Sequence, residues 1–256
     1  MTRIVNIMPM AGLGKRFFKN NYNLPKPLIP INKKPMFIQA AKSMPKSTLN
    51  IFICNKNLLN KFHIKDILIK EYKKNFKIIT VKRTTKGQAN TCLLADKLIK
   101  KNDKIFIHSC DSLIRYSAVD LNKKITNSDA VVLTTRPNKA HLKNIRSYGW
   151  VKISKDKIKK ITCKKKASSK PNKDYVIIGS FAFKNKKIFT NTIKSLFRSK
   201  KTINNEYYMD MVFSHALENN YKISNLLIKS YISWGTPREL TNWRKKKCKN
   251  LTIKIS

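Results

Sequence analysis

The residues best suited to chemistry lie near the start of the chain, where glycines and cations follow a short apolar run typical of a buried strand. Gly12 and Gly14 allow backbone N–H groups to approach a phosphate closely, and Lys15 and Arg16 add positive charge at the same turn. A Pro-Lys-Pro sequence follows, and its two prolines hold the backbone extended, so that Lys26 stands on a stiff arm. Together these features indicate a cradle for a nucleoside triphosphate.

Two better-known phosphate loops do not fit this turn. The dinucleotide-binding fingerprint requires a third glycine three residues after Gly14, and Phe17 stands there. The P-loop requires Gly-Lys followed by Ser or Thr, whereas Gly14 and Lys15 are followed by Arg16. An ordinary turn between a strand and a loop is the alternative interpretation when this turn is considered alone.

A longer string of residues is more specific than the turn itself. The sequence AGLGKRF followed by PKPLIPINKKPM resembles the N-terminal signature of the sugar-phosphate nucleotidyltransferases. In that family the loop wraps the triphosphate, an arginine steadies the leaving pyrophosphate, and the lysine of the PKP element contacts the phosphate under attack. The resemblance implies catalytic roles for Arg16 and Lys26. It implies nucleotide contacts from Ala11, Gly12, Gly14 and Lys15.

A second glycine turn, at residues 84–91, reads TTKGQANT and lies between a predicted strand and a predicted helix. Strand ends that lead into helices form the ligand edge of an open α/β sheet. The Gln88 amide can offer a donor and an acceptor to a nucleobase, and relatives read the base with a glycine and an amide at this place. The resemblance therefore assigns Gly87 and Gln88 to the nucleotide. A polar residue that faces water at a helix start is the alternative.

Asp111 is the candidate metal ligand, because it follows the predicted strand at residues 104–110. A carboxylate at such a strand end is well placed to hold Mg²⁺ against phosphates, although a lone aspartate is also common as a turn residue or a helix cap. No second aspartate stands two residues later, so the chain lacks the DxD element that glycosyltransferases with a related fold usually carry. Its absence disfavours a glycosyltransferase. Mg²⁺ is therefore the expected cofactor.

The predicted metal site departs from the family pattern at a second position. Many relatives carry a metal-binding aspartate two residues before the glycine of a Gly-Thr-Pro element. That glycine is Gly235 here, and Ser233 stands in place of the aspartate. Three alternatives are open: Asp111 and the substrate phosphates suffice, Asp210 assists, or the enzyme is weak or inactive.

Later elements of the chain resemble the sugar-phosphate side of the family site. Gly149 lies in a Tyr-Gly-Trp-Val sequence and Gly179 in the strand VIIGSFAF, and the matching glycines of the family face the sugar. Lys164 is implied to pair with the sugar phosphate, although Cys163 replaces the acid that many relatives have beside it. Glu206 is implied to accept hydrogen bonds from sugar hydroxyls. A surface lysine and an acid favoured by a helix dipole are the alternatives.

The charge of the chain is extreme, and two interpretations compete for it. The 256 residues carry a net charge of +43, from 56 Lys and Arg against 13 Asp and Glu. Nucleic-acid binding is one interpretation; compositional drift is the other, because lysine, asparagine and isoleucine are encoded by AT-rich codons. The lysines are spread along nearly every segment, without an RNA-binding motif or a stacked-aromatic pattern. This distribution favours drift and no specific nucleic-acid partner.

Cysteine usage and hydropathy predict a cytoplasmic protein. The five cysteines include no CxxC pair, which argues against a disulfide framework and against a zinc site. No apolar run approaches the ~20 residues of a membrane span, and the N-terminus lacks a signal-peptide pattern.

The apolar pattern predicts alternating strands and helices, and therefore an α/β fold with a mostly parallel sheet. The resemblance implies a single three-layer α/β/α Rossmann-like domain over residues 1–245, with an inserted β-hairpin lid and a basic C-terminal tail at residues 246–256. Strands are expected at residues 4–8, 50–54, 76–81, 104–110, 128–135 and 176–183, the hairpin at 148–163, and helices at 35–44, 57–72, 88–99, 186–199 and 205–218.

The implied reaction transfers a nucleoside monophosphate from an NTP to a sugar 1-phosphate. It releases pyrophosphate and forms an NDP-sugar for surface polysaccharide or glycoconjugate synthesis. The partners are then these small molecules, with a homo-oligomer left open. A cytidylyltransferase that acts on phosphocholine or another alcohol phosphate is an alternative of the same class. A basic nucleic-acid-binding protein, a catalytically weak nucleotide-sugar binder and a glycosyltransferase that consumes NDP-sugars are alternatives of other classes.

Overall fold

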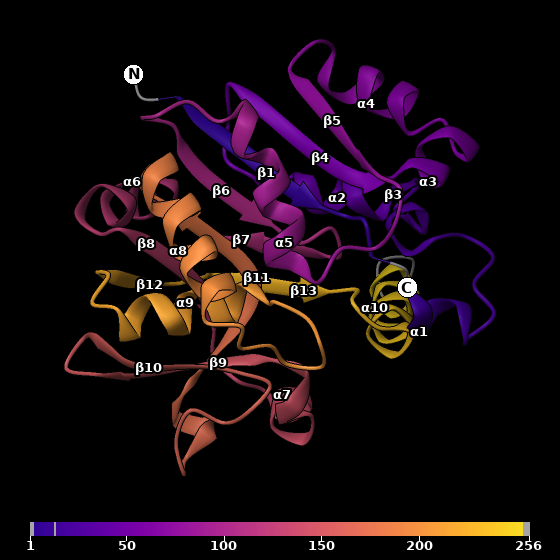
Figure 1. Ribbon diagram of the computed structural model, residues 1–256. Coiled ribbons are helices and arrows are strands. Elements are labelled where there is room, and N and C mark those ends of the chain that lie inside the picture. The colour runs from indigo at the N-terminus through magenta and orange to yellow at the C-terminus, as the bar shows by residue number, and fades with distance from the viewer. Residues whose placement is uncertain (1–2, 13, 253–256) are drawn as a thin grey trace.

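A nine-stranded mixed sheet runs through the computed structural model, which describes residues 3–12 and 14–252 (Figure 1). Seven strands lie in the order β10-β9-β11-β6-β1-β4-β5, and β8 and β12 branch from β11. The strands are β1 (Ile4–Pro9), β4 (Leu49–Asn55), β5 (Phe76–Val81), β6 (Lys104–His108), β8 (Ala130–Thr135), β9 (Gly149–Ser154), β10 (Lys157–Cys163), β11 (Tyr175–Phe183) and β12 (Ile223–Leu227).

The centre of the sheet is parallel. β1 pairs in parallel with β4 on one side and β6 on the other, and β5 continues this order beyond β4. The interiors of β1 and β4 are buried, as expected for continuous apolar runs covered on both faces. The predicted α/β fold with parallel central strands is therefore confirmed. β11 runs antiparallel to β6, β8 and β9, which makes the whole sheet mixed.

Helices cover both faces of the sheet. Successive side chains of a strand point to opposite faces, so each central strand contributes to two separate cores. Ile7 belongs to the core that β1 forms with α5, α8 and α9, whereas Met8 belongs to the core formed with α2 and α4. The helices are α1 (Lys15–Phe18), α2 (Met36–Ala41), α3 (Lys56–Lys61), α4 (Ile64–Tyr72), α5 (Gln88–Leu93), α6 (Ala118–Asn127), α7 (Lys139–Lys143), α8 (Lys186–Arg198), α9 (Met209–Glu218) and α10 (Pro237–Thr252).

Three predicted helices differ from the observed ones for local reasons. The helix expected at residues 57–72 is divided into α3 and α4, because His63 adopts a left-handed conformation with φ of 48°. α5 passes after Leu93 into a 3-10 turn over Leu94–Leu98. The helix expected from residue 205 begins only at Met209. The chain before it forms an isolated antiparallel β-bridge between Ile203 and Glu206, which excludes a helical backbone there.

A small second sheet returns the C-terminal part of the chain to the end of β6. β6 ends at His108, two residues earlier than predicted, and the chain turns into β7 (Ser112–Arg115). β7 pairs antiparallel with β13 (Ser230–Ser233), and sequence analysis anticipated neither strand. A third sheet pairs β2 (Pro30–Ile31) with β3 (Lys34–Pro35). The pairing of β7 with β13 brings the residues just before β7 close to the residues just after β13.

The predicted hairpin is present as β9 and β10, which lie at the lower edge of the molecule in Figure 1. α10 continues through Thr252, so the expected boundary after residue 245 falls inside this helix. Within the described residues, no helix combines the length and the apolar character that crossing a membrane requires.

Candidate active site

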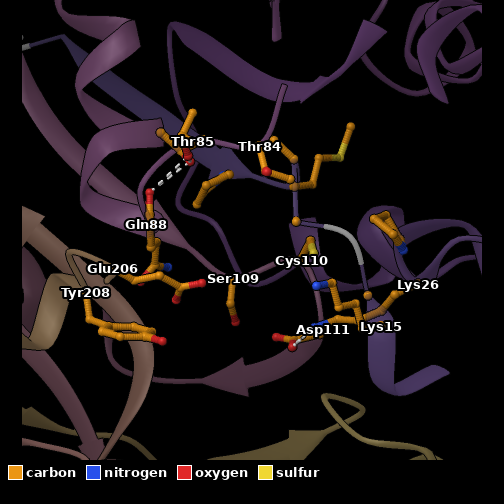
Figure 2. Close-up of a pocket in the computed structure, with 18 residues that line it drawn as sticks. Lys15, Lys26, Thr84, Thr85, Gln88, Ser109, Cys110, Asp111, Glu206 and Tyr208 are labelled. Atoms are coloured by element: carbon orange, nitrogen blue, oxygen red, sulfur yellow. Dashed lines mark hydrogen bonds and ion pairs between the residues drawn. The ribbon is translucent and has the colours of Figure 1, made fainter. Parts of the chain in front are cut away.

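An open cavity of about 640 Å³ lies where the chain leaves the C-terminal ends of β1, β5 and β6. Its lining comes from the loop after β1, from Lys26 and Pro27, from the turn before α5, from the loop after β6, and from Glu206 and Tyr208. Ligands of open α/β sheets bind at this edge. Figure 2 shows Lys15, Lys26 and Asp111 toward one end and Gln88, Glu206 and Tyr208 toward the other, with Ser109 between them.

Most of the predicted site residues meet in this cavity. The residues that line it are Ala11, Gly12, Gly14, Lys15, Lys26, Gly87, Gln88, Asp111 and Glu206. Four predicted residues do not line it, namely Arg16, Gly149, Lys164 and Gly179. Six lining residues with hydroxyl or thiol side chains were not predicted from the sequence, namely Thr84, Thr85, Thr91, Ser109, Cys110 and Tyr208. Their nearness in sequence to Gly87, Asp111 and Glu206 is the signal that could have identified them.

The first glycine turn and the Pro-Lys-Pro arm fit together closely. Gly14 has φ of 62°, and a Cβ atom built on it would lie 3.0 Å from the Cβ atom of Lys26. A glycine is therefore favoured by backbone conformation and by the approach of Lys26. Phe17, which is buried, anchors the short helix α1. Gly12 differs, because no atom of the described residues lies within 4 Å of a Cβ atom built there. Its position leaves open space on the cavity side of the loop.

Lys26 and Asp111 form an ion pair at the wall of the cavity. The Lys26 Nζ and Asp111 Oδ2 atoms are 2.5 Å apart, and each side chain is 21% exposed. Burial opposes the charged form of both groups, but their mutual attraction and hydrogen bond outweigh it. The pKa of Lys26 is therefore raised and the pKa of Asp111 is lowered. Both groups are charged at neutral pH and are available to bind ions of opposite sign.

The second glycine turn is clamped to the segment that carries Glu206 and Tyr208. Gly87 has φ of 103°, and a Cβ atom built on it would lie 2.6 Å from both the N and the O atom of Tyr207. The Tyr207 N–H donates to the Lys86 carbonyl oxygen at 2.8 Å, and the Ala89 N–H donates to the Tyr207 carbonyl oxygen at 3.0 Å. These backbone contacts hold Gln88 in the same cavity as Glu206 and Tyr208.

Lys164 and Gly149, which were expected on the sugar-phosphate side of the site, lie outside the lining of this cavity. Lys164 Nζ donates a hydrogen bond of 2.7 Å to the Tyr208 hydroxyl oxygen and lies 4.2 Å from the centre of the Tyr208 ring. A Cβ atom on Gly149 would overlap the Asp210 carboxylate. Burial raises the pKa of Asp210 to about 7, against the opposing charge of Lys164. Packing against Asp210 is thus sufficient to explain the glycine at position 149.

Two other expected residues also lie outside the lining. A Cβ atom on Gly179, which has φ of 74°, would lie 3.2 Å from the Cβ and Oγ atoms of Ser109, so this glycine supports a lining residue from behind. Arg16 is exposed on α1. Burial raises the pKa of Tyr148 to about 12, Glu239 adds to the rise, and the positive charge of Arg16 opposes it.

Oxygen atoms from three residues surround the space beside Gly235. A Cβ atom built on Gly235 would lie 3.0 Å from Asp111 Oδ2, 3.5 Å from Glu239 Oε2 and 3.5 Å from Ser233 Oγ. Carboxylate and hydroxyl oxygens are donors that suit Mg²⁺, so the donor set fits the expected cofactor. Among the described residues, no group of three or more His, Cys, Asp or Glu side chains could hold a metal ion by itself. Substrate oxygens would have to complete the coordination.

Comparisons with known proteins agree with this architecture. The nucleotidyl transferase family matches residues 6–243. The nucleoside-diphosphate-sugar pyrophosphorylase from Vibrio cholerae RC9 is 20% identical, with a TM-score of 0.77 over 93% of this chain and 98% of that chain. A UDP-glucose pyrophosphorylase complexed with UDP-glucose is 17% identical, with a TM-score of 0.72 over 96% of this chain and 100% of that chain. The inositol-1-phosphate CTP transferase from T. maritima is 13% identical, with a TM-score of 0.71 over 93% of this chain and 92% of that chain. A search of curated proteins gave no match.

The fold and the cavity define an α/β protein with an open cavity at the carboxyl edge of its sheet, where proteins of this architecture bind ligands. The chain belongs to the nucleotidyl transferase family, whose match spans nearly all of the described residues. This confirms the resemblance drawn from the AGLGKRF and PKPLIPINKKPM sequences. The protein is an enzyme of the nucleotidyltransferase class.

Proposed function

We propose that this enzyme transfers a nucleoside monophosphate from an NTP to a sugar 1-phosphate, with release of pyrophosphate and formation of an NDP-sugar. The observation that carries the proposal is the ion pair between Lys26 and Asp111, which stands in one cavity with the glycine loop and Gln88. A cation that can bind phosphate thus lies next to a carboxylate that can bind a metal ion. The product would supply surface polysaccharide or glycoconjugate synthesis.

The nucleotide end of the cavity is assigned from the two glycine turns. Gly12 and Gly14 expose backbone N–H groups, and Lys15 adds a charge beside them, so this loop is suited to the triphosphate. Ala11 lies in the same loop. Gln88 is half-buried in the second turn, where its amide can donate to and accept from a base edge. The two turns lie on opposite sides of Ser109 in Figure 2, which leaves the span between them for the nucleotide.

The chemistry requires neutralisation of charge more than proton transfer. An anionic phosphate oxygen of the acceptor attacks the α-phosphorus in line, a new P–O bond forms, and the bond to the β-phosphate breaks. The attacking oxygen is already deprotonated, so no strong base is needed. Lys26 neutralises charge at the α-phosphate, and Arg16, on exposed α1, steadies the leaving pyrophosphate. Mg²⁺ held by Asp111 would supply further neutralisation and would align the phosphates.

The acceptor end of the cavity is assigned to Glu206 and Tyr208. Glu206 can accept hydrogen bonds from sugar hydroxyls, and Lys164 reaches the same place through the Tyr208 hydroxyl. A sugar phosphate is supported by two structurally similar proteins, a nucleoside-diphosphate-sugar pyrophosphorylase and a UDP-glucose pyrophosphorylase complexed with UDP-glucose. Another similar protein is named as an inositol-1-phosphate CTP transferase. Alcohol phosphates are therefore the alternative acceptors.

A screen of substrate pairs tests the proposal. Thermal shifts with each of the four NTPs and Mg²⁺ would first identify the preferred base, since a ligand that binds only the folded state raises Tm. Pyrophosphate release would then be measured with sugar 1-phosphates, inositol phosphate and phosphocholine. We expect one NTP and a sugar 1-phosphate to release pyrophosphate and to yield an NDP-sugar in equal amounts. Release only with an alcohol phosphate would overturn the sugar assignment, and neither shift nor release with any pair would overturn the whole proposal.

A further inference from the structure

Glu239 lies beside Asp111 because of the way that β7 and β13 pair. Ser233 is opposite Ser112 in this antiparallel ladder, and the Trp234 N–H continues it by donating to the Asp111 carbonyl oxygen at 2.8 Å. Gly235 follows immediately, and α10 begins two residues later. The first turn of α10 therefore returns Glu239 toward the carboxylate of Asp111.

The oxygens of Asp111 and Glu239 approach the same point. Asp111 Oδ2 lies 3.0 Å, and Glu239 Oε2 3.5 Å, from the position that a Gly235 side chain would occupy. Gly235 does not have a left-handed backbone conformation that would demand glycine. The absence of a side chain at position 235 therefore serves to keep the space between these two carboxylates open.

Helix capping explains only part of the position of Glu239. The Glu239 N–H donates to Thr236 Oγ1 at 3.2 Å, and the Thr236 hydroxyl donates to Glu239 Oε2 at 2.9 Å, as expected of a first-turn acid opposite a capping threonine. The Tyr148 hydroxyl donates to Glu239 Oε1 at 3.3 Å. These contacts fix the carboxylate, and they leave acceptor capacity on both of its oxygens. In a glutamine the amide oxygen could accept from one of these hydroxyls while the amide N–H donates to the other hydroxyl oxygen, and the backbone cap from the residue 239 N–H to Thr236 would be unchanged.

The charge of Glu239 is not explained by capping. Among the side chains that the structure describes, no lysine, arginine or histidine forms an ion pair with Glu239, although the chain carries 56 Lys and Arg. Two neighbouring carboxylates repel each other, and Lys26 compensates only Asp111 directly. A divalent cation between Asp111 and Glu239 would balance both charges.

We propose that Glu239 supplies the second carboxylate of a divalent-cation site shared with Asp111, and so performs the role that Ser233 cannot. The proposal rests on the proposed function, because the oxygens of a bound nucleoside triphosphate complete the coordination of the cation. Ser233 Oγ, 3.5 Å from the same point, already accepts from the Gly235 N–H at 3.3 Å and contributes no charge. Mg²⁺ is accordingly held weakly by the free protein and firmly with nucleotide.

The variant Glu239→Gln separates the two roles, because it keeps the capping hydrogen bonds and removes the charge. The affinity of the preferred NTP would be measured by calorimetry with Mg²⁺ and with EDTA, and the ratio of the two affinities reports the contribution of the metal. We expect Glu239→Gln to lower this ratio by ~10-fold or more, with Tm and the affinity in EDTA unchanged. The exposed Glu218→Gln is the matched control. Adding Ser233→Asp to Glu239→Gln should restore the ratio.

Mn²⁺ provides a readout that does not depend on nucleotide. Titration of the protein with Mn²⁺, followed by the electron paramagnetic resonance of the free ion, should show weak binding that both Asp111→Asn and Glu239→Gln reduce. If the affinity ratio and the Mn²⁺ titration of Glu239→Gln equal those of the wild type, Glu239 is only a helix cap and the proposal is wrong. If no NTP binds the wild type under either condition, the proposed function fails, and the Mn²⁺ titration then decides the role of Glu239.

Discussion

Lys26 and Asp111 are separated by 85 residues in sequence and yet form an ion pair of 2.5 Å between Nζ and Oδ2. The pair joins the arm that follows the first glycine turn to the end of β6. Each partner holds the other charged and in place, which reduces the reorganisation that binding requires. In the proposed function Asp111 would hold Mg²⁺ and Lys26 would contact a phosphate oxygen, so a bound Mg²⁺ and triphosphate would compete with this ion pair.

Removal of either proposed phosphate-binding cation should reduce the reaction strongly. We expect Lys26→Ala and Arg16→Ala each to lower kcat/KM for pyrophosphate release by at least ~100-fold, because each cation neutralises charge that develops in the transition state. Lys74→Ala, an exposed lysine remote from the cavity, is the control for loss of charge. Turnover close to that of the wild type in both variants would rule out the assigned roles of Lys26 and Arg16.

The two glycine turns should respond differently to the same substitution. At Gly87 a Cβ atom would meet the backbone of Tyr207 at 2.6 Å in a conformation with φ of 103°. We expect Gly87→Ala to cost at least ~2 kcal/mol of unfolding free energy, which corresponds to a fall in Tm of roughly 4 °C or more. At Gly12 a Cβ atom would meet no atom within 4 Å in the part of the chain that the structure describes. Gly12→Ala should therefore keep the wild-type Tm but weaken NTP binding, because the methyl group occupies the space for phosphate.

Thermal denaturation and NTP calorimetry on both variants measure these effects. Equal losses of Tm would mean that Gly12 has a structural role, and full NTP affinity in Gly12→Ala would show that the phosphates do not approach that residue.

The convergence of Gly12, Gly14 and Lys26 on one cavity was predictable because its signal in the sequence is local. Gly12, Gly14 and Lys26 lie in one continuous stretch, so residue type and spacing already define their arrangement. Asp111 was predictable from its place at a strand end. Glu239 was not, because its approach to Asp111 depends on the pairing of β7 with β13. These strands have four residues each and carry no alternation long enough to recognise.

Glycines of the acceptor end show a second limit of sequence reasoning. A glycine can leave room for a ligand or for another part of the chain, and sequence alone does not distinguish these. Gly149 leaves room for Asp210, and Gly179 leaves room for Ser109. Tyr208 and Ser109, which line the cavity, belong to residue types that are common anywhere on a protein surface. Tyr208 is brought to the cavity by the clamp between Gly87 and Tyr207, a contact between distant segments, whereas Ser109 is brought there by its place directly after β6.

The charge of +43 should produce only non-specific binding to nucleic acid. Dispersed lysines that contact phosphates release counterions from the nucleic acid, but they do not form a groove that contacts base edges. The affinity for nucleic acid should therefore fall steeply as the salt concentration rises. Fluorescence anisotropy with a duplex DNA and a structured RNA would measure this at low salt and at about 0.15 M. We expect binding at low salt that vanishes at the higher concentration. Sub-micromolar binding of a defined RNA at about 0.15 M salt, or RNA that survives purification, would contradict this prediction.

Asp210 should make stability depend on pH in an unusual direction. Burial raises its pKa to about 7 in the folded protein, against the opposing charge of Lys164, from an ordinary value of 3.8. The folded state therefore binds a proton more tightly than the unfolded state, and the contribution of Asp210 to stability falls as pH rises from about 4 to about 7. Above that range the carboxylate is ionised beside Gly149 and the loss is complete. The side chain of Asp210→Asn cannot ionise, so this variant should lose less stability than the wild type over the same pH range.

Urea denaturation at about pH 5 and at about pH 8 would test this difference in the wild type and in Asp210→Asn. We expect Asp210→Asn to have a larger free energy of unfolding than the wild type at the higher pH. At the lower pH the two free energies should approach each other. Asp156→Asn, at the exposed turn between β9 and β10, controls for the removal of one acid from a basic chain. The prediction is wrong if Asp210→Asn loses as much stability between the two pH values as the wild type does.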